Sequence, residues 1–226
     1  MKIKIIDDIK PKFNEAAMKN KLRITESDDI ELFDGMMEIV LEKARPKVAF
    51  CEAYITGRYD DGVEVNGRRF KCNLMKNNLA DVNRVFPFTA TCGRELYDWA
   101  KSIDDIFIAY WADHIMEVAL RGAIAELYDT IKNRYGVSKL SSMNPGSLEG
   151  WPIEQQPSLF ELLDNKQKEI GIELTESFLM VPQKSVSGLL FKSKSGYTNC
   201  KLCEMTNCPS RKAPFEPGLR EKLTEE

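Results

Sequence analysis

Three cysteines near the end of the chain have the spacing of metal ligands. Cys200, Cys203 and Cys208 form the pattern C-x-x-C-x-x-x-x-C within the stretch "CKLCEMTNC". Two thiolates in one C-x-x-C turn bind one zinc ion or one iron of a cluster, and a third thiolate occupies a further position. The alternative is three unligated thiols in a tail. It is less favoured, because loop cysteines at ligand spacing are open to oxidation unless a metal occupies them.

A closed site needs a fourth ligand from elsewhere in the chain. Cys92 lies in "TATCGREL", where a strand-like run changes to a helix-like run. Amides at a helix start favour a thiolate, so we expect Cys92 to complete the site. Cys51 and Cys72 lie in strand-like runs, where cysteine behaves as a small hydrophobic residue, and the single histidine, His114, lies within a predicted helix. Four thiolates suit Zn²⁺ or an iron–sulfur cluster, and the spacing does not choose between them.

A second polar group lies on the helix predicted over residues 103–135. Its segment "IFIAYWADHIMEVALRGAIAELY" is apolar around most of its circumference, which predicts substantial burial. Asp113, Glu117 and Arg121 recur at intervals of four residues, so they share one face of this helix. Such a stripe either lines a cleft or contains an ordinary Glu117–Arg121 pair on the solvent side.

The composition is that of an ordinary globular protein. The chain has 226 residues, of which 43% are hydrophobic and 30% charged, and its formal net charge is −3. This mild acidity gives no electrostatic reason to expect nucleic acid or an anionic membrane as a partner. No apolar run is long enough for a membrane helix, and the first residues lack the pattern of a secretory signal. We therefore expect a cytoplasmic protein, in which unevenly spaced cysteines favour metal or redox chemistry over disulfides.

The elements that must position these residues predict an α+β fold. The stretch "GVEVNGRRFKC" predicts a hairpin with Asn66-Gly67 as its turn. "RVFPFTATC" predicts a strand, and Pro87 favours the edge of a sheet for it. Helix-like and strand-like runs alternate without a repeating βαβ pattern. They predict a single domain with a largely antiparallel sheet and flanking helices.

The stretch "LTESFLMVPQKSVSGLLF", residues 174–191, carries a family resemblance. Together with "WADHIMEV" and "LFELL" upstream, it closely resembles the activation domain of cobalamin-dependent methionine synthase. That family has T-E-S-F-x-M-x-P followed by S-V-S-G in this register. The residues that fit are Thr175, Glu176, Ser177, Phe178, Met180, Pro182, Ser185, Val186, Ser187 and Gly188.

The resemblance defines three parts of the chain and implies a fold. It extends over about residues 75–197, the activation-domain-like core. An N-terminal α/β portion, residues 1–74, precedes this core, and residues 198–226 form a Cys-rich metal-binding segment with a charged tail. The family fold is one α+β unit on a bent antiparallel sheet. The family domain binds S-adenosylmethionine and presses against the corrinoid domain while cob(II)alamin is reduced and remethylated.

The resemblance also implies a ligand site. Asp113 matches an aspartate of the family's A-D-R helix, and Glu117 matches a glutamate that contacts the amino group of S-adenosylmethionine. Pro145 and Gly146 hold the Pro-Gly place of the family's donor loop. Ser142 and Ser147 stand where the family has an Arg and a Tyr that grip the carboxylate, which predicts weak or no S-adenosylmethionine binding. The full expected ligand set is Asp113, Glu117, Arg121, Pro145, Gly146, Ser147, Glu176, Ser187 and Tyr197.

These observations lead to one main functional hypothesis and two alternatives. The main one is a stand-alone activation-domain-like protein that assists reductive reactivation of a corrinoid protein, with an iron–sulfur cluster or another metal centre. The chain has no Asp-x-His-x-x-Gly corrinoid loop. The corrinoid protein would therefore act in trans, with an electron donor as a possible second partner. The alternatives are a zinc-pinned, non-catalytic binding module and a methyltransferase that uses S-adenosylmethionine directly.

Overall fold

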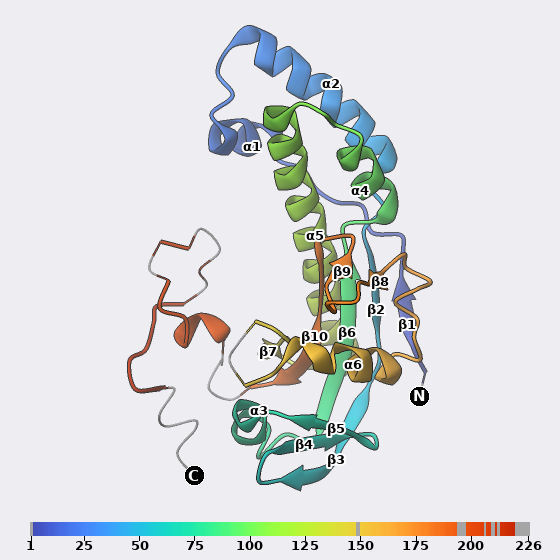
Figure 1. Cartoon of the computed structure of the whole chain (residues 1–226), viewed down its shortest axis with the longest axis vertical. Helices are drawn as coiled ribbons and strands as arrows, with labels where there is room; N and C mark the ends of the chain where they lie inside the picture. Colours follow the sequence, from blue (N-terminus) through green and yellow to red (C-terminus); the bar gives the residue numbers. More distant parts are fainter. Residues whose placement is uncertain are drawn as a thin grey trace.

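A computed structural model of the chain describes residues 2–147, 150–193, 198–205, 207–208, 211 and 213–219. It shows an antiparallel sheet, a long helix along one face of that sheet, and a group of helices beyond one end of it (Figure 1). The helices are α1 (Glu15–Leu22), α2 (Ser27–Lys43), α3 (Asn73–Asn78), α4 (Arg94–Lys101), α5 (Ile106–Tyr135) and α6 (Gln156–Leu162), with the 3-10 turns η1 (Ile153–Gln155) and η2 (Asn199–Lys201).

The main sheet is arranged around one strand, β6 (Arg84–Thr91), in the order β1-β2-β6-β3-β4-β5. Strand β10 pairs with the other edge of β6 and then with β7, and every strand pair is antiparallel. The remaining strands are β1 (Lys4–Ile6), β2 (Lys47–Phe50), β3 (Ala53–Tyr59), β4 (Gly62–Val65), β5 (Arg68–Lys71), β7 (Leu140–Met143) and β10 (Ser185–Lys192), with β8 (Glu173–Leu174) and β9 (Met180–Val181) as a separate pair. The predicted α+β class with a largely antiparallel sheet is confirmed.

The sheet bends where β3 leaves β6. Strand β3 pairs with β6 only through Ala53 and Tyr54, and it then continues beside β4 after a shift in register between Ile55 and Gly57. Strands β3, β4 and β5 form a ribbon that turns away from the body of the sheet (Figure 1). The predicted hairpin is present as β4 and β5. Its turn residues Asn66 and Gly67 both have positive φ, at 44° and 80°, as a type I′ turn requires.

Pro87 does not lie at a sheet edge, so that prediction is wrong. It lies in β6, which has paired strands along both sides. The carbonyl of Pro87 accepts a hydrogen bond from Cys51 N at 3.1 Å. The side of Pro87 that carries its carbonyl therefore faces the break between β2 and β3. In an antiparallel strand the N–H and C=O of a residue point to the same side. The missing N–H therefore coincides with a gap in the ladder, and the centre of the sheet tolerates the proline.

The two faces of the sheet are covered differently. On one face, Ala123, Leu127 and Ile131 of α5 pack against apolar side chains of β2, β6 and β10. On the other face, α3, α6 and the segment around Trp151 cover the sheet in two further apolar clusters. Leu202 belongs to the first of these clusters and is 2% exposed, so it anchors the C-terminal segment to the domain.

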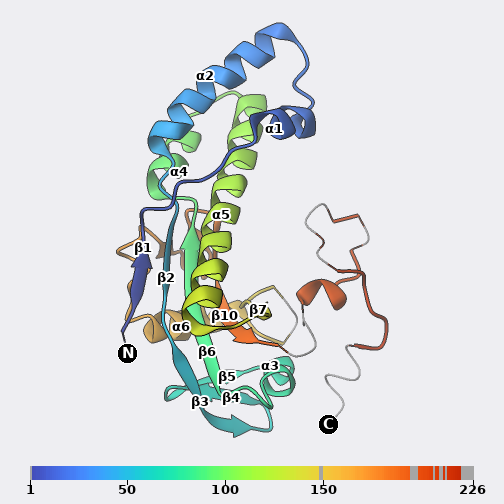
Figure 2. The same cartoon turned by 180° about the vertical axis from the view of Figure 1, so that it is seen from behind.

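The helical end of the molecule has its own core. Helices α1, α2, α4 and the first half of α5 gather beyond the sheet (Figure 2). Asp105 starts α5 by accepting hydrogen bonds from Phe107 N and Ile108 N at 2.8 and 3.1 Å. Ile106, Phe107 and Tyr110 are exposed, so the predicted burial of this helix applies from its second turn onward. Among the described helices, none is long and apolar enough to cross a membrane.

Candidate functional site

A groove of about 750 Å³ runs along α5. Its walls come from one side of α5, from Val186 at the start of β10, and from Arg211 of the C-terminal segment. Glu117 and Arg121 line it, so two of the three residues of the predicted stripe share one concave surface. Tyr128 lies further along the same wall, and burial raises the pKa of its hydroxyl although the neighbouring Ser142 of β7 opposes the rise.

Glu117 and Arg121 also form an ion pair. Arg121 Nη2 lies 2.5 Å from Glu117 Oε1, and the two side chains are 52% and 30% exposed. Burial alone would raise the pKa of Glu117, but the charges of Arg121 and Lys21 outweigh it and hold that pKa below its ordinary value. Glu117 is therefore an anion at neutral pH, paired within the groove wall. Both expected arrangements, the pair and the cleft, are present together.

His114 lies directly behind this pair. Its Nδ1 is 3.9 Å from Glu117 Oε2 and 3.4 Å from Lys21 Nζ of α1. Burial and the Lys21 ammonium lower the pKa of His114, so the imidazole is neutral at neutral pH. Its side chain is only 10% exposed, and it supports the groove from within the helical core.

Asp113 has a different partner from the rest of the stripe. Its carboxylate lies 2.9 Å from Lys184 Nζ, in the segment between β9 and β10. The Lys184 carbonyl in turn accepts a hydrogen bond from Cys92 N at 3.0 Å. Asp113 thus ties α5 to the chain that enters β10, and it is not among the described residues that line the groove. Lys184 had no place in the sequence prediction.

The predicted loop after β7 forms a tight turn. Gly146 N donates to Trp151 O at 2.9 Å, and Ser147 N donates to Asn144 O at 3.2 Å. Pro145 is buried, whereas Gly146 and Ser147 are exposed. The Asn144 side chain donates to the carbonyl of Ser187 at 2.7 Å, which joins this loop to β10. A Cβ at Gly188 would lie 2.4 Å from Met143 O, so glycine at this position permits the close approach.

The family motif forms the β8–β9 hairpin and the β10 strand. Thr175 and Ser177 share a hydrogen bond of 3.0 Å inside the hairpin turn, and Glu176 is exposed at its tip. Ser187 is 2% exposed, on the face of β10 opposite the α5 groove. Most of the motif therefore has a visible structural role. Tyr197 lies outside the described residues.

The cysteine segment is a compact set of turns beside the domain. Cys200, Cys203 and Cys208 are half-buried. Cys203 N donates to Cys200 O at 3.4 Å, which closes the C-x-x-C turn, and Lys201 pairs with Glu216 at 3.4 Å. Within the described part of the chain, no three His, Cys, Asp or Glu side chains are already placed to hold a metal ion. The metal site therefore stays a prediction.

The structure gives no support to Cys92 as the fourth ligand. Cys92 is 0% exposed and packs with Leu96, Phe33 and other apolar side chains of the helical core. Burial raises the pKa of its thiol to about 12. In both cartoon views, η2 lies to the side of the sheet, away from the junction of β6 and α4 where Cys92 lies (Figures 1 and 2). The junction turns this side chain inward, toward α2, and not toward the C-terminal segment.

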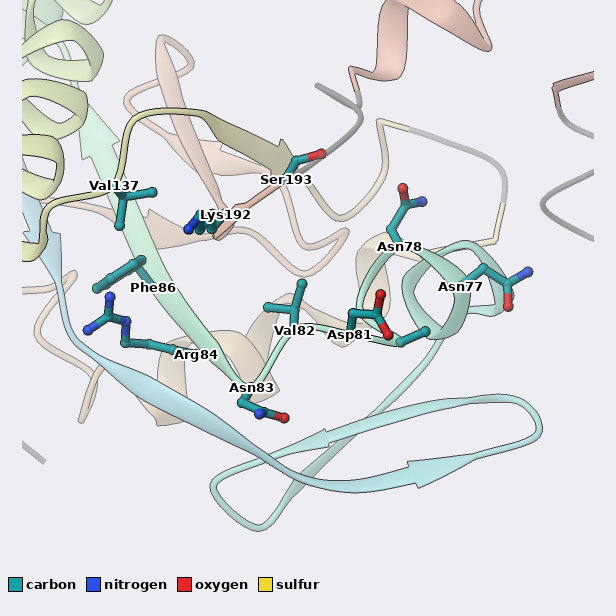
Figure 3. A pocket seen from close by; sticks show the side chains of 11 residues that line it. Asn77, Asn78, Asp81, Val82, Asn83, Arg84, Phe86, Val137, Lys192 and Ser193 are labelled. Carbon is teal, nitrogen blue, oxygen red and sulfur yellow. The ribbon is translucent and has the colours of Figure 1, made fainter.

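A second cavity, of about 590 Å³, lies at the other end of β6. Figure 3 shows Arg84 and Phe86 of β6 on one side of it, Asn77 and Asn78 on another, and Lys192 and Ser193 at the end of β10. Arg84 is already paired with Glu52 at 3.4 Å. None of the predicted site residues within the described ranges lines this cavity.

The site combines a bent antiparallel sheet, a long helix on one face of it and a groove beside that helix. Part of this arrangement matches a known family. Residues 144–209 match the family model described as "Vitamin B12 dependent methionine synthase, activation domain". The resemblance seen in residues 174–191 is thereby confirmed, and the matched region also includes all three C-terminal cysteines.

A solved structure agrees with this family match. The chain superimposes on a crystal structure of the MetH reactivation domain bound to AdoHcy with a TM-score of 0.60. The two sequences are 14% identical, and the match covers 85% of this chain and 79% of that chain. This likeness establishes the fold. A comparison with curated proteins finds no match.

Several residues of the site escaped the sequence prediction, among them Tyr128, Asp129, Lys184 and Arg211. Lys184 pairs with Asp113, and Arg211 joins the cysteine segment to the groove. Arg211 follows the last cysteine by three residues in "CPSR", a spacing that could have drawn attention to it. Lys184 offered no comparable signal, because its partner is 71 positions away in the chain.

Proposed function

We propose that this chain is an activation protein that docks on a corrinoid-binding domain and assists the reduction of its cobalt. The family match over residues 144–209 is the observation that carries this proposal. The fold shared with the MetH reactivation domain supports it. In the reduction, cob(II)alamin gains one electron from an external donor and becomes cob(I)alamin, and no bond to carbon forms in that step.

The cysteine segment is the proposed redox centre. Three thiols at ligand spacing fit thiolate chemistry, and they lie on one short, half-buried segment beside the domain. An iron–sulfur cluster would supply electron transfer, which zinc has no redox chemistry to perform. To bind a metal, the three thiol side chains must turn toward one another, because among the described residues no three ligating side chains surround a common point. The chain's part is to present these thiols and the α5 groove on neighbouring surfaces.

The groove is the proposed docking or ligand surface. Glu117 and Arg121 give it a charged wall, whereas Leu120, Ile124 and Val186 give it an apolar one. The tight loop at residues 144–147 carries no charge that could grip a carboxylate. We therefore expect S-adenosylmethionine to bind weakly or not at all. Calorimetric titration that returned a micromolar dissociation constant would overturn this expectation and favour direct methyl transfer from S-adenosylmethionine.

The proposal is tested with a corrinoid-binding domain of a methionine synthase loaded with cob(II)alamin. The paramagnetic signal of Co(II) is followed by electron paramagnetic resonance under a low-potential reductant, with and without this chain. Faster loss of the signal in the presence of the chain supports the proposal. Equal rates over a range of chain concentrations would contradict it.

A zinc-pinned binding module is the second candidate. Leu202 is buried in a core cluster and Leu219 packs against the same cluster, so the segment has a structural attachment of its own. Metal analysis of anaerobically purified protein separates the two functions. Iron with acid-labile sulfide supports the redox centre, and stoichiometric zinc supports the binding module.

A further inference from the structure

Arg211 contacts the backbone of all three C-terminal cysteines. Its Nη1 donates to Cys200 O at 3.0 Å, and its Nη2 donates to Cys203 O at 2.9 Å. Its backbone N–H donates to Cys208 O at 3.2 Å. The same guanidinium also donates to the carbonyls of Met205 and Ala213. The guanidinium thus joins Cys200 and Cys203, and the backbone of the same residue joins Cys208.

This arrangement fixes the distances between the three cysteines better than a series of local turns does. A guanidinium is a rigid planar fork with five donors, so the carbonyls bound to it are held in one plane around one centre. The C-x-x-C turn and the third cysteine are separated by four residues, and those of them that the structure describes belong to no helix or strand. A loop without such a clamp would lose conformational freedom when it gathered three thiolates around a metal, and that loss would weaken binding.

Arg211 also faces the groove. It lines the same concave surface as Glu117 and Arg121 of α5, although it belongs to the C-terminal segment. The clamp therefore forms part of the groove wall as well as the centre of the cysteine segment. A change in the position of the segment would therefore alter this part of the groove wall.

We propose that Arg211 is the positioning residue of a thiolate metal site formed by Cys200, Cys203 and Cys208, and that it holds this site against the α5 groove. The proposal rests on the metal centre of the proposed function, but it concerns the order of the segment and not the reduction of cobalt. Arginine is needed for its fork. Lysine at this position keeps the charge but replaces the planar set of donors by one ammonium.

The test compares Arg211→Ala and Arg211→Lys with the wild-type chain. Arg69→Ala is the matched control, because Arg69 also donates to an acceptor, Asp61, at 2.7 Å, but it lies on the β4–β5 hairpin. Metal-free protein is titrated anaerobically with Co²⁺ and followed by the visible absorption of thiolate-bound cobalt. Hydrogen exchange of a peptide covering residues 198–205 is measured without metal.

We expect Arg211→Ala to weaken Co²⁺ binding at least about tenfold and to speed exchange in this peptide by a similar factor, because several hydrogen bonds to a charged group are lost. Arg69→Ala should leave Co²⁺ binding and hydrogen exchange unchanged. Arg211→Lys should restore only a small part of the lost affinity and of the lost protection from exchange. Wild-type values for Arg211→Ala would overturn the proposal, and full rescue by lysine would overturn the positional role. If even the wild-type chain binds no Co²⁺, the metal centre fails. Unchanged hydrogen exchange in Arg211→Ala would then overturn the clamp as well, whereas faster exchange would retain it as a structural clamp.

Discussion

The six cysteines of this chain lie in two unlike regions. Cys51, Cys72 and Cys92 belong to the sheet and its junctions, where they are at most 3% exposed. Cys200, Cys203 and Cys208 lie on a segment of turns outside the sheet and are half-buried. Burial raises the pKa of Cys51 and of Cys92 to about 12, so these thiols stay protonated and unreactive at neutral pH.

The difference between the regions shows what cysteine spacing can and cannot reveal. Close spacing within one short segment keeps thiols near one another whatever the rest of the fold does. A cysteine far away in the chain joins them only if the fold turns its side chain toward them. Cys92 was expected to do so because it precedes a helix, but its side chain points into the helical core.

The largest expected effect is on stability in the sheet region. Replacing Cys92 by Asp places a carboxylate among apolar side chains without a partner. We expect a loss of about 3–5 kcal/mol in the free energy of unfolding, measured by urea denaturation with circular dichroism. Cys208→Asp is the matched change in the segment and should cost no more than about 0.5 kcal/mol when both variants are compared as metal-free protein. Similar losses for the two variants would break the contrast between the regions.

The second expected effect is on metal content. Cys203→Ala should lose the bound metal of the purified protein, because the C-x-x-C turn has only one thiol left. Cys92→Ala should keep it, since the structure places this thiol elsewhere. Elemental analysis measures both. Full occupancy in Cys203→Ala would remove the proposed site, and loss of metal in Cys92→Ala would restore Cys92 as the fourth ligand.

The third expected effect is a dependence of stability on alkaline pH. The pKa of the Cys92 thiol is raised from its ordinary value of 9.0 to about 12, so above pH 9 the unfolded chain releases this proton while the folded chain keeps it. The contribution of this thiol to stability is therefore constant below pH 9 and falls as the pH rises toward 12, by up to about 1.4 kcal/mol per pH unit.

Cys51 and the Tyr128 hydroxyl, whose pKa burial also raises, act in the same direction. Urea denaturation at several pH values measures the slope. The slope should be shallower in Cys92→Ala. An equal slope in that variant would show that Cys92 does not carry this effect.

The smallest expected effect on stability concerns the groove beside the cysteine segment. Glu117 pairs with Arg121, whose side chain is 52% exposed, so Glu117→Gln should change the free energy of unfolding by no more than about 0.5 kcal/mol. Thermal denaturation checks this value. The same change should slow the reactivation of a corrinoid partner, because it removes one of the two acidic side chains among the described residues that line the groove, the other being Asp129. Asp129→Asn serves as the control, and a Glu117→Gln protein that reactivates its partner at the wild-type rate would show that Glu117 has no role there.

Several features of this protein were determined by the sequence alone, because they depend on near neighbours. Asn66-Gly67 specified the hairpin turn through its backbone preferences, and the long apolar run specified α5. The T-E-S-F and S-V-S-G stretch carried the family resemblance, which the match over residues 144–209 confirms, and the structure shows local roles for its residues. The hairpin closes on its own side chains, and a Cβ at Gly188 would collide with β7.

Other features were decided only by the tertiary structure. Pro87 was placed at an edge because its missing N–H disfavours a central strand, but the break between β2 and β3 lies opposite it. The three residues of the α5 stripe have different surroundings: Asp113 pairs with the distant Lys184, whereas Glu117 and Arg121 pair with each other and line the groove. Arg211 has its role because turns bring four separate carbonyls to one guanidinium. Local preference fixes which groups exist and how they are spaced, whereas packing between distant segments fixes which of those groups meet.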